Sequence, residues 1–586
     1  MTGTAGRDEP RRLTQSEDPS DGVVTESGAT VDGGGPPAEE PGFWQFCRSR
    51  KAVVVLLLVT LLAGALRYRS YRRQRHIPSD TKGFLEVVSM LRGELGLRDV
   101  VPQRVGNPLY SILIYLMQKV EPDRLRACRT VAVVASTLAV PVFCLIAWAM
   151  VRRLLPGLLA GLLGATSIAL VRLGSVPLAG SLFILCSAVA LLACLLFVAR
   201  PSLRLALATG AFGGLSWATW GPGSFGLIAL GAPMALALRG EWRGRRAIGL
   251  LAAFGAAFVV CGRGPTLALR PYTRGLKPGI PYTKACIVEG AMYARGIGFR
   301  NDNVYDLNKE CTNYRMYDEY RKYSLLTLLN RYGKKPYRAF LVNIGQSVTD
   351  TLPKTLAPIF ALCFPLAFGL LAFRRSQSGP RQLAVLLFLV PFLVLIPAVQ
   401  LHDRYIYPVA LALLPLTAVG LGWMLQERPA FDLLGRGFSR ILACLVLLVA
   451  LPYGAYKAYH VPKEKEWSPG YREVCDWILE KHGPEFDFNV MLRYHGAYVW
   501  LGRNCVSLPR NDVDELARYC RHTHTRYIIF SPMEEEQNEH LIPAFHHGTE
   551  FVAANTKFTI VKISGQGPTK VLLIEVTPVG DLPPLP

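Results

Sequence analysis

The chain has 586 residues, of which 51% are hydrophobic and only 18% are charged, and its formal net charge at pH 7 is +22. A soluble protein carries about 25% charged residues, so this composition excludes an ordinary soluble enzyme and predicts a polytopic membrane protein. The basic residues are scattered between apolar runs. That distribution argues against a nucleic-acid partner and favours membrane lipids.

The N-terminal residues 1–43 are rich in Gly, Pro, Ser, Thr, Asp and Glu. They have too few large apolar side chains to offset the entropy of ordering, so we expect a disordered tail. The run AVVVLLLVTLLAGAL then begins at Ala52. It starts too late, and without a small-residue cleavage site, to be a signal peptide. It is therefore interpreted as a retained first transmembrane helix.

A strongly basic segment, residues 67–129, follows this helix and contains Asp80. The apolar positions between Phe84 and Leu95 predict an amphipathic helix on the membrane surface. Residues 107–120 predict a second helix that is too short to span the bilayer. The arginines that flank these helices are Arg67, Arg69, Arg72, Arg73, Arg75, Arg124, Arg126 and Arg129.

Further apolar runs bring the expected number of spans to about eleven. A long segment, residues 263–352, interrupts the series. The runs after the first lie near 130–150, 154–172, 177–199, 203–218, 222–238, 246–262, 353–373, 382–401, 405–424 and 439–456.

The short loops between these runs predict the orientation. If the N-terminus is cytoplasmic, the inner loops are VRRLLP, ARPSLR, RGEWRGRR, FRRSQSGPR and QERPAFDLLGRGFSR, and all of them are basic, as the positive-inside rule requires. Residues 67–129, 263–352, 401–405 and everything after about 457 are then extracytoplasmic. We expect a multi-pass protein of the cell (inner) membrane.

The C-terminal region, residues 457–586, has a different pattern. Stretches rich in β-formers (488–493 and 526–530) alternate with stretches of helical apolar spacing (470–482 and 512–523). This alternation predicts a small external α/β domain. The expected fold class is thus mainly α, with a polytopic membrane domain at 44–456.

Two groups of polar residues are candidates for a site. Guanidinium groups bind phosphate through paired hydrogen bonds, so the arginines near Asp80 suit a phosphate-bearing lipid; their alternative role is to reach ordinary phospholipid headgroups. The sequence HDRY (402–405) begins a late span from the outside. Charges there face a cavity or partner, or Asp403 and Arg404 simply anchor the helix end.

Several motifs, in this order, resemble one family. They are Asp80 with Phe84 and LRGE (91–94), NPLY (107–110), the span pair at 213–238, RYIYPVALALLPLTAVGLG (404–422) and the tail at 475–530. Together they are similar to the polyprenyl-phosphate-sugar-dependent glycosyltransferases of the GT-C fold. That group includes protein O-mannosyltransferases and the lipid A aminoarabinose transferase, and the likeness is to enzymes of the glycosyltransferase family 39 type. The likeness covers most of residues 45–530.

The resemblance implies transfer of a sugar from an undecaprenyl or dolichyl phosphate to an extracytoplasmic protein, lipid or glycan. It implies no cofactor, and leaves the need for a divalent metal open. A base opposite the leaving group implies inversion at the anomeric carbon. The implied base is Asp80, and the residues expected to hold the donor phosphate are Arg72, Arg73, Arg75, Arg404 and Tyr405.

One departure from the family pattern keeps alternatives open. Many relatives carry a second acid at the outer start of the fourth span, where this chain has Gly180 or Ser181. Glu86 is the candidate for that second acid, with Glu94 and Asp99 nearby. The alternatives are a catalytically inactive, glycolipid-binding relative and a transporter or flippase of lipid-linked solutes. Transport is disfavoured because charges concentrate at span ends and no inverted repeat is visible.

Overall fold

The computed structural model describes residues 43–73, 77–78, 81–94, 106–239, 244–273, 379–399, 403–426 and 436–460, most of 469–579, and isolated positions between 307 and 345. Residues Phe43–Pro586 form one compact unit. Residues 1–42 of the predicted tail, the predicted span at 353–373 and most of the loop 263–352 lie outside the described residues.

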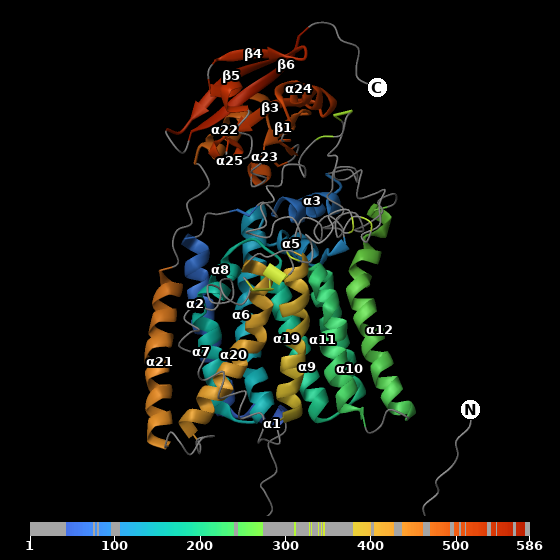
Figure 1. Cartoon of the computed structure of the whole chain (residues 1–586), viewed down its shortest axis with the longest axis vertical. Helices are drawn as coiled ribbons and strands as arrows, with labels where there is room; N and C mark the ends of the chain where they lie inside the picture. Colours follow the sequence, from blue (N-terminus) through green and yellow to red (C-terminus); the bar gives the residue numbers. More distant parts are fainter. Residues whose placement is uncertain are drawn as a thin grey trace, which may run out of the picture. The chain divides into compact units, whose positions relative to one another are not determined.

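Long helices lie side by side in the membrane part, residues 43–460 (Figure 1). Two short 3-10 helices, η2 (Gly221–Phe225) and η4 (Arg270–Thr273), connect some of them. The α-helices are α1 (Phe43–Arg48), α2 (Arg50–Arg73), α3 (Thr81–Leu91), α5 (Leu109–Met117), α6 (Arg124–Val151), α7 (Leu154–Thr166), α8 (Ile168–Ser175), α9 (Gly180–Ala199), α10 (Leu203–Thr219), α11 (Gly226–Ala237), α12 (Arg245–Ala268), α19 (Gly379–Val399), α20 (Asp403–Gln426) and α21 (Arg436–Tyr459).

Among the described residues, five helices are long and apolar enough to cross a membrane. They are α2, α6, α9, α12 and α21, and the bent pair α7 and α8 makes a sixth if it is one span. Shorter apolar helices include parts of α11, α19 and α20. The chain is therefore a multi-pass membrane protein, and the total of about eleven spans stays a prediction.

The predicted span at 154–172 is broken into α7 and α8, which meet at an angle of 55°. A helix break within a membrane leaves carbonyl groups without their usual partners. Arg67, on α2, is the partner of two such carbonyl groups. Its guanidinium donates to the carbonyl oxygens of Gly164 (3.2 Å) and Ala165 (3.4 Å). The hydroxyl of Ser136 donates to Leu170 O beyond the break at 3.2 Å. Arg67 thus stabilises the bend.

Glycines allow α10 and α12 to approach closely. A Cβ atom at Gly210 would overlap the carbonyl oxygen of Phe254, and one at Gly214 would overlap that of Phe258. Small residues at such positions let two backbones pack directly, which is how helices associate in lipid. The predicted short and Gly-rich run at 203–218 is therefore a tightly packed helix.

The two non-spanning helices predicted within residues 67–129 are α3 and α5. Phe84 of α3 and Tyr110 of α5 pack edge to face, with ring centres 4.8 Å apart. The Tyr110 hydroxyl donates to Cys128 O of α6 at 2.8 Å, which fixes α5 against that span. Nine of the eleven residues of α3 are buried, so this helix is covered on more sides than an amphipathic surface helix would be.

The C-terminal region contains one six-stranded sheet with the strand order β2-β1-β3-β6-β5-β4. β1 is parallel to β2 and β3, whereas the pairs β3–β6, β6–β5 and β5–β4 are antiparallel. The elements are α22 (Pro469–His482), β1 (Asn489–Leu492), α23 (Tyr498–Leu501), β2 (Cys505–Ser507), α24 (Val513–His522), β3 (Thr525–Phe530), α25 (Pro532–Glu535), α26 (Ile542–His546), β4 (Glu550–Ala553), β5 (Thr556–Ser564) and β6 (Val571–Pro578).

Alternate residues of β3 enter different cores, as the two-residue period of a strand requires. Tyr527 and Ile529 pack in a cluster with residues of α22 and α3, whereas Ile528 and Phe530 pack with residues of α24. The central strand β3 is therefore buried on both faces of the sheet. This arrangement confirms the predicted small α/β fold of the C-terminal region, called the C-terminal domain below.

Candidate active site

The backbone on both sides of position 80 is bound to its surroundings. Asp80 itself lies outside the described residues, but Ile77 is only 2% exposed and Thr81 is fully buried. The Thr81 amide donates to Pro78 O at 3.0 Å, and its hydroxyl donates to Pro177 O at 3.3 Å. Thr81, the residue after the predicted base, is thus fixed against the connection between α8 and α9.

Glu86, the candidate second acid, is 3% exposed and is paired with Lys82 one helical turn earlier, at 3.5 Å. The Lys82 ammonium also donates to Cys505 O of β2 at 2.7 Å and lies 5.9 Å from the centre of the Tyr498 ring. Burial raises the pKa of Tyr498 and the Glu86 carboxylate raises it further. Glu86 therefore belongs to a buried cluster between α3 and the C-terminal domain.

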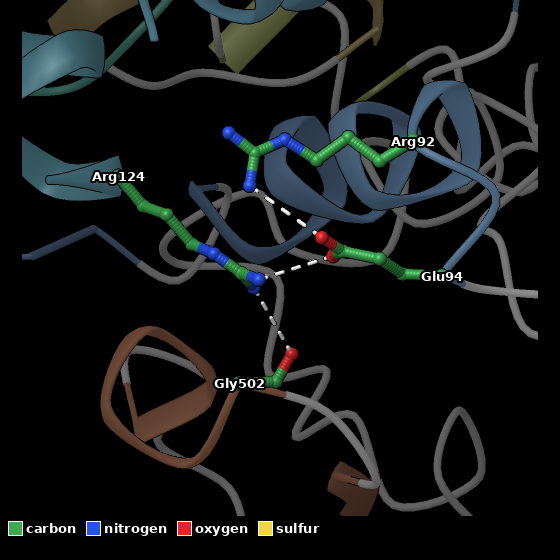
Figure 2. A network of polar contacts seen from close by, with 4 residues as sticks. All are labelled: Arg92, Glu94, Arg124 and Gly502. Carbon is green, nitrogen blue, oxygen red and sulfur yellow. Dashed lines mark hydrogen bonds and ion pairs between the residues drawn. The ribbon is translucent and has the colours of Figure 1, made fainter. Parts of the chain in front are cut away.

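Glu94, another carboxylate that follows α3, lies in a polar network with two arginines (Figure 2). Its carboxylate oxygens are 3.4 Å from Arg92 and 3.0 Å from Arg124. Arg124 also donates to Gly502 O, just after α23, at 3.4 Å. Residues 67–129 thus contact the C-terminal domain at two places, and this network is more exposed than the Lys82 contact.

The arginines of α2 do not form one group. Arg67 is fully buried, and besides the α7 carbonyls it donates to Ser136 Oγ at 2.6 Å. Arg69 and Arg73 both donate to Tyr459 O, at 3.2 and 3.1 Å, and the Arg69 guanidinium stacks 3.3 Å above the Tyr459 ring. They therefore neutralise the C-terminal end of α21, where a helix carries partial negative charge.

Arg72 is the exposed arginine of this helix end. With Tyr68, Arg69 and Arg73 it lines an open surface depression. The two predicted phosphate ligands that the structure describes, Arg72 and Arg73, are thus neighbours on one surface. This surface has the charge and the hydrogen-bond donors that a phosphate group requires.

The side chains of the other predicted phosphate ligands lie outside the described part of the chain. Arg75 lies outside the described residues. Arg404 and Tyr405 lie in the first turn of α20, but their side chains are outside the described part of that helix. The convergence of Asp80, Arg404 and Tyr405 on one cavity stays a prediction.

The position where relatives carry the second acid is filled by packing. Ser181 is 1% exposed, and its hydroxyl donates to Leu173 O at 3.1 Å. A Cβ atom at Gly180 would lie 2.9 Å from a methyl carbon of Leu173. A side chain at Gly180 would therefore require the Leu173 side chain to move, and Ser181 is buried with its hydroxyl bonded to a carbonyl oxygen.

Lys82 is the residue that sequence reasoning missed. The spacing of Lys82 and Glu86 on an otherwise apolar helix was a signal for an ion pair, whereas a backbone acceptor such as Cys505 O leaves no signal in a sequence. In the described ranges no three His, Cys, Asp or Glu side chains are close enough to hold a metal ion.

No known protein family and no curated protein sequence matches this chain. Among solved structures, ArnT from Cupriavidus metallidurans bound to undecaprenyl phosphate is similar over 89% of this chain and 97% of its own, with a TM-score of 0.54 and 13% identity. The archaeal oligosaccharyltransferase AglB from Archaeoglobus fulgidus, in complex with an inhibitory peptide and a dolichol-phosphate, is similar over 84% of this chain and 70% of its own, with a TM-score of 0.53 and 12% identity. The apo form of the A. fulgidus oligosaccharyltransferase gives a TM-score of 0.54 over 83% of this chain and 70% of its own, at 12% identity.

These similarities establish the fold of this chain. It is the GT-C fold of membrane glycosyltransferases, as the sequence motifs predicted. At 12–13% identity the likeness concerns the fold alone.

Proposed function

We propose that this protein is a membrane glycosyltransferase that moves a sugar from a polyprenyl-phosphate-linked donor to an extracytoplasmic acceptor. The observation that carries the proposal is the similarity to ArnT, which extends over 97% of the ArnT chain and therefore includes both the membrane helices and the C-terminal domain. That structure is described as bound to undecaprenyl phosphate. The basic surface at the outer end of α2 suits such a ligand.

In the proposed reaction the acceptor hydroxyl or amine attacks the anomeric carbon, and the bond from that carbon to the phosphate oxygen breaks. The proton of the acceptor passes to Asp80, a role that contributes about 10²–10⁴-fold to the rate of an enzyme. The bonding electrons leave with the polyprenyl phosphate. Because attack and departure occur on opposite faces, the anomeric configuration inverts.

Cations would stabilise the phosphate as it gains charge. We assign this role to arginines at and just after the end of α2 and to Arg404 in the first turn of α20, with the Tyr405 hydroxyl as a further donor. The proposed ligands are Arg72, Arg73, Arg75, Arg404 and Tyr405. Of the two roles open to Glu86, second acid or partner of Lys82, the buried ion pair favours the second.

The orientation belongs to the same proposal. The basic inner loops predict a cytoplasmic N-terminus in the cell membrane, which puts position 80 and the C-terminal domain on the extracytoplasmic side. Lipid-linked sugars would then meet protein, lipid or glycan acceptors on that side.

One observation favours a second candidate, an inactive relative that binds a glycolipid. Gly180 and Ser181 stand where the family pattern has an acid, and both pack closely against Leu173. Such a protein would retain the phosphate ligands and lose transfer. The two candidates therefore differ in turnover but agree in binding.

The test is turnover by the full-length protein in lipid nanodiscs, with sugars linked to undecaprenyl and dolichyl phosphate. Release of polyprenyl phosphate is measured for the wild type, for Asp80→Asn and for Glu550→Gln, a control at an exposed position of β4. We expect Asp80→Asn to lose about 10²-fold or more and Glu550→Gln to retain the wild-type rate. Near wild-type turnover by Asp80→Asn would remove Asp80 from the mechanism, and donor binding without any turnover would favour the inactive relative.

A further inference from the structure

The C-terminal domain contacts the helix that follows the proposed base. The first contact is the Lys82 ammonium, which joins Glu86 of its own helix to Cys505 O of β2. The side chains of Lys82 and Glu86 are only 15% and 4% exposed. Water and salt therefore screen this pair weakly.

The second contact, around Arg124, is more open (Figure 2). Arg124 and Glu94 have side chains that are 29% and 37% exposed. The carbonyl oxygen that Arg124 reaches belongs to Gly502, which ends α23 with a φ of 83°, a conformation that residues with a Cβ atom rarely adopt. This contact therefore contributes little to the stability of the interface, because exposed ion pairs are weak.

Apolar packing fills the space around the first contact. Leu85 and Val88 of α3 are in the same buried cluster as Tyr498 and Leu501 of α23. Each of these residues is at most 2% exposed. The face of α3 that carries Lys82 is therefore enclosed by the C-terminal domain, and α5 packs on the side that carries Phe84.

From these contacts we propose that the C-terminal domain holds α3 in place for the reaction, and that Lys82 is the positioning residue. The proposal rests on the proposed function, because α3 matters for transfer through Asp80, which directly precedes it in the chain. Thr81 binds Pro177 and Lys82 binds Cys505. The first turn is thus bound by the membrane part and by the C-terminal domain at successive residues.

Such positioning has a large kinetic effect. A reacting group that is displaced by about 1 Å can lose about 10²-fold in rate. Loss of Lys82 would free the first turn of α3 from β2 and would leave Glu86 buried without its cation. The donor-phosphate ligands would be unaffected, because none of the proposed ones lies on α3.

The experiment compares Lys82→Met, Lys82→Arg and a control in full-length protein in nanodiscs. The control is Lys557→Met, which removes an ion pair with Glu550 (2.6 Å) within the C-terminal domain, where the side chains are 40% and 56% exposed. Two quantities are measured: kcat and KM for an undecaprenyl-phosphate-linked sugar, and hydrogen–deuterium exchange of the Thr81–Leu91 peptides.

We expect Lys82→Met to lower kcat by about tenfold or more, which corresponds to about 1.4 kcal/mol, with the donor KM unchanged within about twofold. Exchange in the first turn of α3 should rise. Lys82→Arg keeps the charge and should recover most of both quantities, and Lys557→Met should match the wild type. If Lys82→Met does not fold, the neutral double variant Lys82→Gln/Glu86→Gln replaces it with the same expectations.

Three results would overturn the proposal. The first is unchanged exchange of α3 in the variant without Lys82, and the second is increased exchange with an unchanged kcat. The third is a Lys82→Arg variant as slow as Lys82→Met, because the loss would then not depend on the cation. If the wild type itself transfers no sugar, the proposed function fails, and the exchange data alone decide whether Lys82 anchors α3.

Discussion

The C-terminal end of α2 and the first turn of α3 both carry charged side chains, but these charges have different partners. On α2, Arg67, Arg69 and Arg73 donate to backbone carbonyl oxygens where α7 and α21 end. On α3, Lys82 and Glu86 pair with each other and bind the C-terminal domain. The first group stabilises helix ends, and the second joins two parts of the protein.

If residues 67–129 are extracytoplasmic, as the basic loops predict, the arginines of α2 depart from the positive-inside rule, and their bonds to helix ends give the reason. A cation near the end of a helix is stabilised by the unpaired carbonyls there, so it needs no anionic lipid or cytoplasmic loop. Arg72 differs from its neighbours because it is exposed. An arginine cluster in a sequence is therefore not one site: part of it is structural, and part of it is available for a ligand.

The largest effect on stability is expected for Arg67→Met. The change leaves Gly164 O and Ala165 O unpaired at the bend between α7 and α8, and each buried acceptor without a partner costs about 1–3 kcal/mol. The apparent melting temperature in nanodiscs should fall steeply. Arg72→Met on the same helix is the matched control, and equal melting of the two variants would show that the buried and exposed arginines do not differ.

A smaller loss is expected for Lys82→Met. It removes the cation paired with the buried Glu86, a change that costs about 3 kcal/mol or more in a fully enclosed pair, and less here because Lys82 is 15% exposed. Neutralising both residues in Lys82→Met/Glu86→Gln should restore most of the lost stability. A double variant that melts below the single variant would contradict the ion-pair account of α3.

The exposed network in Figure 2 should contribute less than the buried pair of Lys82 and Glu86. Arg124→Gln removes the bonds to Glu94 and Gly502, and exposed pairs contribute about 1 kcal/mol or less. Raising the salt concentration should weaken the wild type towards this variant, because salt screens exposed charges. A destabilisation as large as that of Lys82→Met would reverse the proposed ranking of the two contacts.

The smallest effect concerns His482 in the C-terminal domain, remote in sequence from both charged regions. Its ring is 2.8 Å from the Tyr527 hydroxyl, and burial, then Arg526 and Lys481, lower its pKa. A lowered histidine pKa favours the neutral ring in the folded state, so its contribution is present above about pH 6.5 and is lost as the pH falls through the folded pKa. His482→Gln should flatten the dependence of melting temperature on pH in this range, and an unchanged slope would exclude His482 as its source.

Local residue patterns predicted the strands and helices whose signal lies within a short stretch of sequence. The strands at 488–493 and 526–530 were predicted because they are rich in β-formers, and the helix after Phe84 because its apolar residues have helical spacing. The break near Ser167 was not predicted. It has no proline, and its stability depends on Arg67, which is remote in sequence and appeared as a loop arginine.

The candidate site was predicted less completely, for a related reason. Asp80, Arg404 and Tyr405 were proposed from motif resemblance, which gives residues but no distances. The bond from Lys82 to Cys505 O depends on where β2 lies, and a backbone carbonyl has no sequence signature. Contacts to backbone atoms across long sequence separations, such as Arg73 with Tyr459 O, are beyond pattern analysis.

The central claim is that this protein consumes a polyprenyl-phosphate-linked sugar to modify an extracytoplasmic molecule. The most direct measurement is mass spectrometry of the envelope glycans, glycolipids and glycoproteins from cells that lack the gene, from the same cells complemented with the wild type, and from cells complemented with Asp80→Asn. We predict that one sugar modification disappears on deletion, that its polyprenyl-phosphate-linked donor accumulates, and that only the wild type restores the modification. An unchanged set of modifications in the deletion strain, or full restoration by Asp80→Asn, would contradict this account.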